Sequence, residues 1–269
     1  MRKAQIGFIL GTPFCGSTIF ARALATRPDT FDLGEVDRLS IMGENSFRLD
    51  VEQACETCAA KKQRCPVFDP DHLSQLRLID RPSGLYDLVE RHCGARTILD
   101  GSKHAYWLRK MMADPAVASR ARAILLVRHP APYIARFAQA NGHLEPFAAL
   151  LQGAENWRST YMDLLRSLFA CQTKFIILRL DQFRADPDAV ARYAAEFLGT
   201  DCAMTGGQLS NSATHTIGGN PDLAARTPLQ DTTTIFSESF DTSADQRAAM
   251  QFTPGLSDLA VNVFGFKLA

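Results

Sequence analysis

A short segment near the N-terminus combines glycines and hydroxyl side chains at a spacing that suits phosphate binding. The stretch ILGTPFCGST (residues 9–18) carries Gly11 and Gly16, with Ser17 and Thr18 directly after the second glycine. A strand that leads into such a turn and then into a helix directs backbone N–H groups and the positive helix end at one point. The segment therefore predicts a phosphate or sulfate site. The alternative is a strand-to-helix turn in which the hydroxyls only cap the helix.

The loop lacks the lysine of a nucleotide-hydrolysing enzyme. Such an enzyme places lysine after the second glycine, on the β and γ phosphates, but Ser17 stands at this position. It also needs an acidic residue at the end of a strand to hold Mg²⁺, and Asp100 is the only good candidate in the sequence. A P-loop kinase or NTPase is therefore a weak interpretation of this loop.

Two cationic residues follow other apolar runs and are expected near the same place. Arg128 ends the run AILLVR, and Lys103 follows a Gly-Ser turn after the run TILD. Ligands of open α/β sheets bind at the carboxyl ends of the strands, so both cations can reach a bound anion there. A surface arginine that closes a strand and a solvated lysine are the alternatives.

Four stretches together resemble the sulfotransferases that use 3′-phosphoadenosine 5′-phosphosulfate. FILGTPFCGSTIFARAL (8–24) resembles the family's 5′-phosphosulfate loop, and LLVRHPAPYIAR (125–136) its 3′-phosphate segment. LDGSKHAYWLRKM (99–111) resembles the DSSK stretch of the bacterial and tyrosylprotein branches, and HTIGGNP (215–221) the Gly-Asn segment that closes over the nucleotide. The resemblance implies transfer of a sulfuryl group to a hydroxyl or amine of an acceptor. The acceptor's class, whether carbohydrate, lipid, small phenol or peptide, stays open.

The resemblance also implies which residues hold the donor. The loop is expected to bind the phosphosulfate, two arginines the 3′-phosphate, and the Gly-Asn segment is expected to cover the nucleotide. These residues are Gly11, Thr12, Cys15, Gly16, Ser17, Thr18, Arg128, Arg136, Gly219 and Asn220. A Gly-Asn-Pro turn that needs a positive φ is the alternative for the last segment.

Two residues are implied as the catalytic pair. Glu35, in the Gly-Glu pair of FDLGEVDRL, resembles the glutamate that takes the acceptor's proton, which is worth about 10²- to 10⁴-fold in rate. Lys103 is expected to stabilise charge on the transferring group or the leaving phosphate. A plain helix glutamate beside Asp37 is the alternative for Glu35, and His104 and His129 are reserve bases.

Several positions depart from the family pattern. Phe14 stands where the family has a cation beside the sulfuryl group, and the loss of such a charge costs a factor of about 10² or more. Arg136 replaces a phosphate-binding serine, and its guanidinium is a competent phosphate donor. Ala131 replaces a common arginine, and Arg226 lies far from the place of another. These departures keep a second interpretation open: a non-catalytic nucleotide-binding protein on a sulfotransferase scaffold.

A cysteine-rich stretch carries a separate signal. CETCAAKKQRCP places Cys55, Cys58 and Cys65 in a Cys-x₂-Cys-x₆-Cys array, which can begin a tetrahedral zinc site. Candidates for a fourth ligand are His72, His92 and Cys93. A disulfide or redox pair and free thiols are the alternatives, and the sequence favours free thiols. Sulfuryl transfer needs no metal, so no metal ligand is expected in the active site.

The elements that position these residues follow from hydrophobic patterning. Short, β-branched apolar runs predict buried strands of a mostly parallel sheet. Helical spacing occupies the segments between them, and the alternation predicts a doubly wound α/β fold with helices on both faces, like that of P-loop NTPases. The strands are expected at 4–10, 96–100, 122–128 and 174–180, and the helices at 17–27, 83–93, 103–112, 131–140 and 146–171. An irregular insertion is expected at 42–72 and a long loop at 201–235.

Composition limits the function classes. The chain has 269 residues, 46% of them hydrophobic, which suits one large α/β domain over residues 1–269. Lys+Arg and Asp+Glu balance at 29 each, so the overall charge gives no reason to expect binding along DNA or to an acidic membrane. The apolar run IGFIL is too short for a signal peptide, no stretch suits a transmembrane helix, and seven cysteines fit reduced thiols. We therefore expect a soluble cytoplasmic protein.

Overall fold

The computed structural model describes the chain in three long segments and several short ones. The described residues are 3–26, 29–38, 55, 58, 64–69, 71, 82–200, 214–217 and 242–268. The predicted donor residues Gly219 and Asn220 and most of the predicted insertion at 42–72 lie outside them. No helix among the described residues is long and apolar enough to cross a membrane.

The described strands form one parallel sheet of six strands. Their bounds are β1 (Gln5–Leu10), β2 (Thr30–Gly34), β3 (Thr97–Asp100), β4 (Ala121–Val127), β5 (Lys174–Arg179) and β6 (Thr214–Ile217). The strand order is β5-β4-β1-β3-β2-β6, and every neighbouring pair is parallel. The predicted doubly wound parallel sheet flanked by helices is confirmed, and so are its four predicted strands.

The helices follow the expected alternation. They are α1 (Ser17–Leu24), α5 (Ser83–Cys93), α6 (Ala105–Met112), α7 (Pro115–Ala118), α8 (Pro130–Ala140), α9 (Pro146–Ala170), α10 (Leu180–Ala185), α11 (Pro187–Leu198), α14 (Ala244–Phe252) and α15 (Leu256–Asp258), with a π-helical turn at Leu259–Val263. Helices α8, α9 and α11 each begin with proline after a residue whose side chain accepts from the first backbone amides, namely His129, Glu145 and Asp186. Proline at the first helical position and an acceptor before it fix where these helices start.

The position of β1 determines where a ligand can bind. β1 lies between β3 and β4, with Phe8 opposite Asp100 and Leu10 opposite Leu125. In the strand order, β2 lies beyond β3 on one flank of β1, and β4 lies on the other flank. The chain therefore moves in one direction from β1 to β2 and in the opposite direction from β3 to β4. Such a change of direction leaves a crevice at the carboxyl ends of the strands. The predicted anion-binding loop starts directly at this point.

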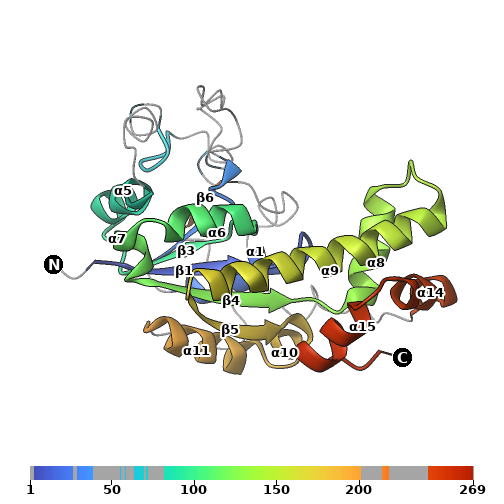
Figure 1. Cartoon of the computed structure of the whole chain (residues 1–269). Coiled ribbons are helices and arrows are strands. Elements are labelled where there is room, and N and C mark those ends of the chain that lie inside the picture. The colour runs from blue at the N-terminus through green and yellow to red at the C-terminus, as the bar shows by residue number, and fades with distance from the viewer. Residues whose placement is uncertain are drawn as a thin grey trace.

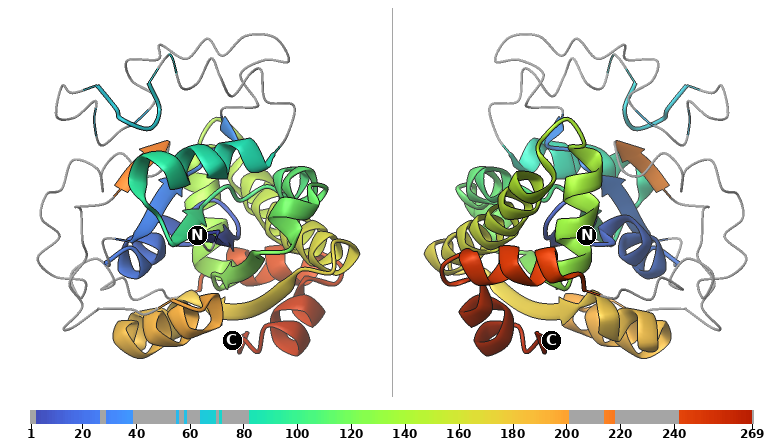
Figure 2. Two further views of the ribbon diagram at one scale, coloured as in Figure 1. Left: turned by 90° about the vertical axis from the view of Figure 1, so that its left-hand side faces the viewer. Right: turned by 90° about the vertical axis from the view of Figure 1, so that its right-hand side faces the viewer.

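Two hydrophobic layers cover the sheet, one on each face. Consecutive β1 residues, such as Phe8 and Ile9, belong to different core clusters, because successive side chains of a strand point to opposite faces of the sheet. One cluster packs under α5, α6, α8 and α9, and the other under α1, α10 and α11. Figure 1 shows α5, α6 and α9 above the sheet and α10 and α11 below it, and the end views of Figure 2 agree.

Two strands differ from the sequence-based expectation. β2 lies where only a short segment after the first helix was expected, and β6 lies inside the expected loop at 201–235. β6 has a polar sequence, Thr-His-Thr-Ile, and pairs with β2 at the sheet edge, Gly34 opposite Ile217. An edge strand of this kind forms because a partner strand is present, which local pattern does not report.

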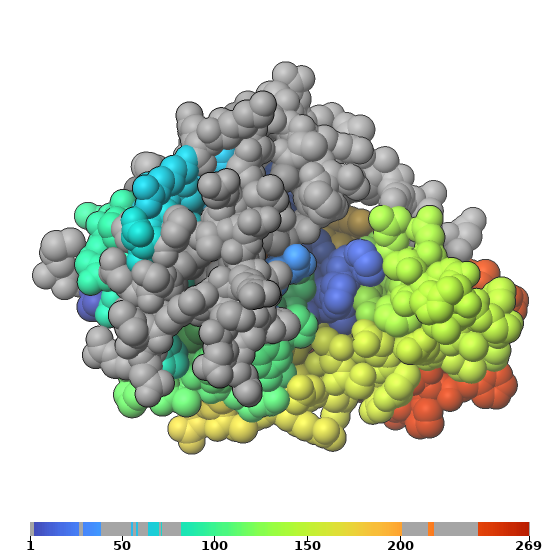
Figure 3. Space-filling view, turned by 90° about the horizontal axis from the view of Figure 1, so that it is seen from above, coloured from blue at the N-terminus to red at the C-terminus, as the bar shows by residue number. Residues whose placement is uncertain are grey.

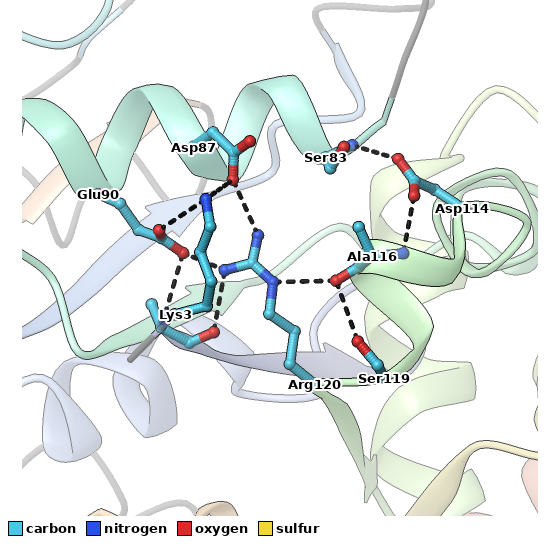
Figure 4. A network of polar contacts seen from close by, with 9 residues as sticks. Lys3, Ser83, Asp87, Glu90, Asp114, Ala116, Ser119 and Arg120 are labelled. Atoms are coloured by element: carbon cyan, nitrogen blue, oxygen red, sulfur yellow. Dashed lines mark hydrogen bonds and ion pairs between the residues drawn. The ribbon is translucent and has the colours of Figure 1, made fainter. Parts of the chain in front are cut away.

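A buried ion network joins α5 to the amino ends of β1 and β4. Arg120, whose side chain is 10% exposed, pairs with Asp87 and Glu90 of α5. Its guanidinium also donates to the carbonyl oxygens of Ala4 (3.0 Å) and Ala116 (3.1 Å). Figure 4 shows Arg120 at the centre of these contacts, with Lys3 at their outer side. This network lies at the amino ends of the strands, whereas the loop after β1 lies at their carboxyl ends.

Replacing Arg120 is expected to destabilise the protein without changing the carboxyl ends of the strands. Arg120→Ala leaves two partly buried carboxylates with the exposed Lys3 as their cationic partner, so we expect the free energy of unfolding to fall by about 3 kcal/mol. Lys3→Ala is the matched control, because Lys3 is 60% exposed and contacts the same carboxylates; it is expected to cost less than about 1 kcal/mol. Urea unfolding followed by tryptophan fluorescence measures both. Equal losses in the two variants would contradict the buried role of Arg120.

Candidate active site

The loop after β1 is a tight turn that only particular residues allow. Gly16 precedes α1 in the left-handed region, with φ 86°. A Cβ on Gly11 would lie 2.6 Å from the carbonyl oxygen of Leu126, so the loop passes directly against β4. The Cys15 amide donates to the carbonyl oxygen of Thr12 (3.2 Å), and the Cys15 side chain is fully buried. The glycine spacing therefore serves backbone approach and a positive φ.

Phe14 is the exposed tip of this loop. Its φ is 62°, a left-handed conformation that is uncommon for a bulky residue, and it is 42% exposed. Its carbonyl oxygen accepts from Nη1 of Arg128 (2.7 Å), and the Arg136 guanidinium lies 5.7 Å from its ring centroid. Seen from above, the early part of the chain, in dark blue, reaches the surface beside the yellow-green region (Figure 3). Both predicted 3′-phosphate arginines thus contact the loop.

Two aromatic residues of α9 fix the end of β4. The Arg128 amide donates to the Tyr161 hydroxyl (3.2 Å), and Trp157 Nε1 donates to the Arg128 carbonyl oxygen (2.9 Å). The Tyr161 hydroxyl donates to the carbonyl oxygen of Leu126 (3.1 Å) and lies 3.3 Å from Thr12 Oγ1. The helix expected at 146–171 buries Trp157 and Tyr161, but helical spacing alone gives no sign of these polar contacts. Tyr161 therefore joins the loop, β4 and α9 through one buried hydroxyl.

Glu35 and Lys103 form an ion pair between neighbouring strand ends. Lys103 Nζ contacts Glu35 Oε1, and both side chains are largely buried, at 13% and 18% exposure. Burial raises the pKa of Glu35, but the charge and hydrogen bond of Lys103, followed by those of Arg38, outweigh burial and leave the pKa below its usual range. Glu35 is therefore ionised at neutral pH and can accept a proton.

A second pair lies beside the first. His104 Nδ1 contacts Asp37 Oδ2, and this hydrogen bond raises the pKa of His104. The turn after β2 is also bonded to the turn after β3 through the Gly101 amide and the Gly34 carbonyl oxygen (2.8 Å). His104, a predicted reserve base, is thus already paired with a carboxylate. The two turns form one unit that holds Glu35 at the sheet edge.

The charge of Lys103 acts on the loop as well. Burial raises the pKa of the Cys15 thiol, while the charges of Lys103 and Arg128 act in the opposite direction. These two cations come from the ends of β3 and β4, on either side of the loop. An anion bound at the loop would therefore meet positive charge from both sides.

Three of the predicted residues have a different or additional role. Arg136 Nη1 donates to Gln139 (2.8 Å), so the side chain lies along α8 as well as over Phe14. The predicted reserve base His129 caps α8: its Nδ1 accepts from the Ala131 amide (3.2 Å), and its Nε2 lies 3.2 Å from the Lys267 carbonyl oxygen. Ser17 is buried, and α1 has no side-chain cap. The capped-turn alternative therefore does not describe this loop.

Asp100, the predicted Mg²⁺ candidate of an NTPase, has a structural role. One carboxylate oxygen accepts from Tyr86 (2.7 Å) and Trp107 Nε1 (2.8 Å), and the other accepts from the Ser102 amide (2.9 Å). Burial raises its pKa to about 6. A carboxylate that already has three donors and lies fully buried holds α5 and α6 on β3, which weakens the kinase or NTPase interpretation further.

The cysteine stretch contacts β6 through a histidine that was predicted for another role. Cys55, Cys58 and Cys65 surround His215 Nδ1, and their ligand atoms all lie within 4.8 Å of one another. His215 was assigned to the loop over the nucleotide, and the fourth-ligand candidates were different. His92 and Cys93 are not in this group, and His72 lies outside the described residues.

Solved structures with the same fold are sulfotransferase domains. The sulfotransferase domain of the Synechococcus PCC 7002 olefin synthase is 17% identical, with a TM-score of 0.61 over 100% of this chain and 98% of that one. The domain from the curacin biosynthetic pathway is 16% identical, with a TM-score of 0.60 over 100% of both chains. At these identities the likeness shows the P-loop NTPase-like fold. A search of curated proteins gives no match.

The family assignment comes from the sequence. A model of the sulfotransferase family matches residues 8–203, which contain the loop after β1, Glu35, Lys103, Arg128 and Arg136. The chain therefore belongs to the sulfotransferase family, as its resemblance predicted.

Removing the Tyr161 hydroxyl is expected to destabilise this edge of the sheet. Tyr161→Phe takes away one buried atom that serves Thr12, Leu126 and the Arg128 amide, so we expect a loss of about 1–3 kcal/mol in the free energy of unfolding. Tyr193→Phe is the control, because Tyr193 is 54% exposed on α11 and should change stability by less than about 0.5 kcal/mol. Chemical denaturation compares the two. No difference between them would show that the Tyr161 contacts contribute little.

Proposed function

We propose that this protein transfers a sulfuryl group from 3′-phosphoadenosine 5′-phosphosulfate to a hydroxyl or amine of an acceptor. The observation that carries the proposal is the Glu35–Lys103 ion pair beside the glycine loop. It combines an ionised, largely buried carboxylate with a cation that also acts on the loop. Family membership supports this reaction type. A binding protein without transfer chemistry would need the cation but not the carboxylate.

The donor would bind across the carboxyl ends of the central strands. Backbone amides of the loop from Gly11 to Thr18 would receive the 5′-phosphosulfate, together with the hydroxyls of Thr12, Ser17 and Thr18. Arg128, which donates to the Phe14 carbonyl oxygen, and Arg136, which lies over the Phe14 ring, would bind the 3′-phosphate. Gly219 and Asn220 are proposed to cover the nucleotide, as the resemblance implies. The Cys15 side chain is buried behind the loop, so its backbone is the part available to the donor.

Lys103 would change partners when the donor binds. Lys103 neutralises Glu35, and its charge also acts on Cys15 of the loop, so a phosphosulfate bound there would be a second anionic partner for it. Transfer of Lys103 toward the donor removes the main influence that lowers the pKa of Glu35, and burial then raises that pKa. The same movement would thus stabilise the donor and make Glu35 a stronger base.

The chemical step follows from these positions. The acceptor oxygen or nitrogen would attack sulfur in line, forming a bond to sulfur while the bond from sulfur to the bridging phosphate oxygen breaks. The electron pair of that bond leaves with 3′-phosphoadenosine 5′-phosphate, whose charge Lys103 would stabilise. Glu35 would take the proton that the acceptor loses.

A non-catalytic nucleotide-binding protein is the second candidate, because Phe14 occupies the place of the family's cation. Lys103 weakens this alternative, because it supplies a cation whose charge acts on the same loop. The two candidates share the donor site and differ in whether transfer occurs.

Nucleotide titration tests the donor site. We expect 3′-phosphoadenosine 5′-phosphate to bind in the micromolar range by calorimetry, and ATP and GTP with Mg²⁺ not to bind. Arg136→Ala should weaken the bisphosphate about tenfold or more but leave adenosine 5′-phosphate unchanged, because only the 3′-phosphate contact is lost. Arg158→Ala, an arginine on α9 that pairs with Glu155, is the control. Preference for ATP or GTP, or binding of none of the nucleotides, would overturn the donor assignment.

Replacement of Glu35 tests the base. With ³⁵S-labelled donor and a panel of carbohydrate, lipid, phenol and peptide acceptors, Glu35→Gln should lower transfer about 100-fold or more. Its affinity for the bisphosphate should stay within about twofold of the parent protein, since a base contributes to the reaction and not to donor binding. Glu196→Gln, an exposed site on α11, is the control. Unchanged turnover would remove Glu35 from the mechanism, and donor binding without transfer to any acceptor would favour the non-catalytic protein.

A further inference from the structure

Three cysteines and one histidine converge at the β6 edge of the sheet, and none of them has a role in the proposed reaction. Cys55, Cys58 and Cys65 are each at most 7% exposed, and His215 is half-buried on β6. The histidine lies 157 residues after Cys58 in the chain. The fold therefore brings atoms of the metal-ligand type from two distant segments to one point. Sequence proximity does not explain this convergence.

The distances fit a tetrahedral metal centre. Nδ1 of His215 lies 3.4 Å from Cys58 Sγ, 3.5 Å from Cys65 Sγ and 3.8 Å from Cys55 Sγ. Zinc binds sulfur at about 2.3 Å and imidazole nitrogen at about 2.0–2.1 Å, and a tetrahedral angle then separates sulfur from nitrogen by about 3.6 Å. The three observed separations lie around this value. A single ion at the centre would therefore reach all four atoms.

The surroundings of the cluster suit thiolate ligands. Cys65 Sγ accepts from the backbone amide of Phe68 (3.2 Å), and Cys55 accepts from the amide of Cys58. Such N–H donors to sulfur stabilise thiolate and are the usual outer contacts of metal-bound cysteine. The His215 ring stacks on Phe31 of β2, with centroids 6.2 Å apart and planes 5° apart, which directs Nδ1 at the sulfurs. Neighbouring residues thus orient both ligand types.

A disulfide explains this arrangement less well. A disulfide would use two of the sulfurs and leave the third cysteine and the imidazole nitrogen without a role at the same point. None of the three cysteines forms a disulfide among the residues that the structure describes. The Cys-x₂-Cys spacing followed by a third cysteine and a distant histidine is a ligand set of structural zinc sites.

We propose that Cys55, Cys58, Cys65 and His215 bind one structural zinc ion. Four protein ligands leave no open position for substrate or water, so the site is structural and takes no part in sulfuryl transfer. The ion would tie the cysteine segment to β6. β6 in turn pairs with β2, and the Glu35 amide donates to the Ile217 carbonyl oxygen (2.6 Å), two residues from His215. The inference is independent of the proposed reaction, because it rests on the ligand atoms alone.

Metal analysis of the untagged full-length protein tests this site. Protein from a zinc-supplemented culture, dialysed without chelator, is expected to contain about one zinc per chain by inductively coupled plasma mass spectrometry. Cys58→Ser and His215→Ala should each lose most of the metal and lower the midpoint of thermal unfolding by about 5 °C or more. Cys171→Ser, a half-buried cysteine outside the cluster, should keep the full metal content and is the matched control.

A measurement on the unmutated protein covers the case in which the variants do not fold. Titration with an organomercurial that captures thiolates should release zinc to a colorimetric chelator in step with three thiols. Cobalt in place of zinc should give the visible absorption of a tetrahedral thiolate site. Protein without zinc or another bound metal, zinc retained in full by both ligand variants, or a disulfide between two of these cysteines by mass spectrometry would each overturn the proposal.

Discussion

The burial of β1 between β3 and β4 is the constraint on which the site depends. A central strand with a covered face on each side satisfies its backbone groups within the sheet and can offer polar atoms to a ligand only where it ends. Glu35, Lys103 and Arg128 all follow strands at this same edge. The network around Arg120, at the opposite ends of the strands, serves stability alone. The fold thus separates the charges that stabilise it from the charges that can meet a ligand.

The cations of the site have partners within the protein. Lys103 is paired with Glu35, and Arg128 donates to the Phe14 carbonyl oxygen. Partners of this kind restrict the conformations of long side chains, which would lower the entropic cost of binding the proposed donor. They also mean that an anion must displace an internal contact, so weakly charged ligands gain little at this edge. Affinity and selectivity would then have the same physical origin.

The sequence predicts the part of the fold that local pattern encodes. The runs that form β1, β3, β4 and β5 are apolar and bounded by turns, so periodicity identifies them. Periodicity does not identify β2 and β6. β2 is short and contains the buried polar residue Asp32, and β6 is polar throughout most of its length. The predicted site residues Glu35 and Lys103 meet, as their motif positions imply, whereas the hydroxyl of Tyr161 could be found only from the packing of α9. Contact between distant segments is the information that pattern lacks.

His215 of β6 is a second residue whose contacts depend on the pairing of distant segments, and the same pairing holds Glu35. A search for a fourth cysteine-site ligand in the sequence favours histidines near the array, but the sheet brings one from β6, because β6 pairs with β2 beside the cysteine segment. Glu35 follows β2 directly and is held on one side by Lys103 and on the other, through its amide, by β6. Only the first of these contacts can change when an anion binds, because the second is part of the sheet. The backbone of Glu35 is therefore fixed, while its carboxylate pairs with two side chains, Lys103 and Arg38, of which Lys103 also acts on the loop. Loss of the Lys103 contact is the change that the proposed role as general base requires.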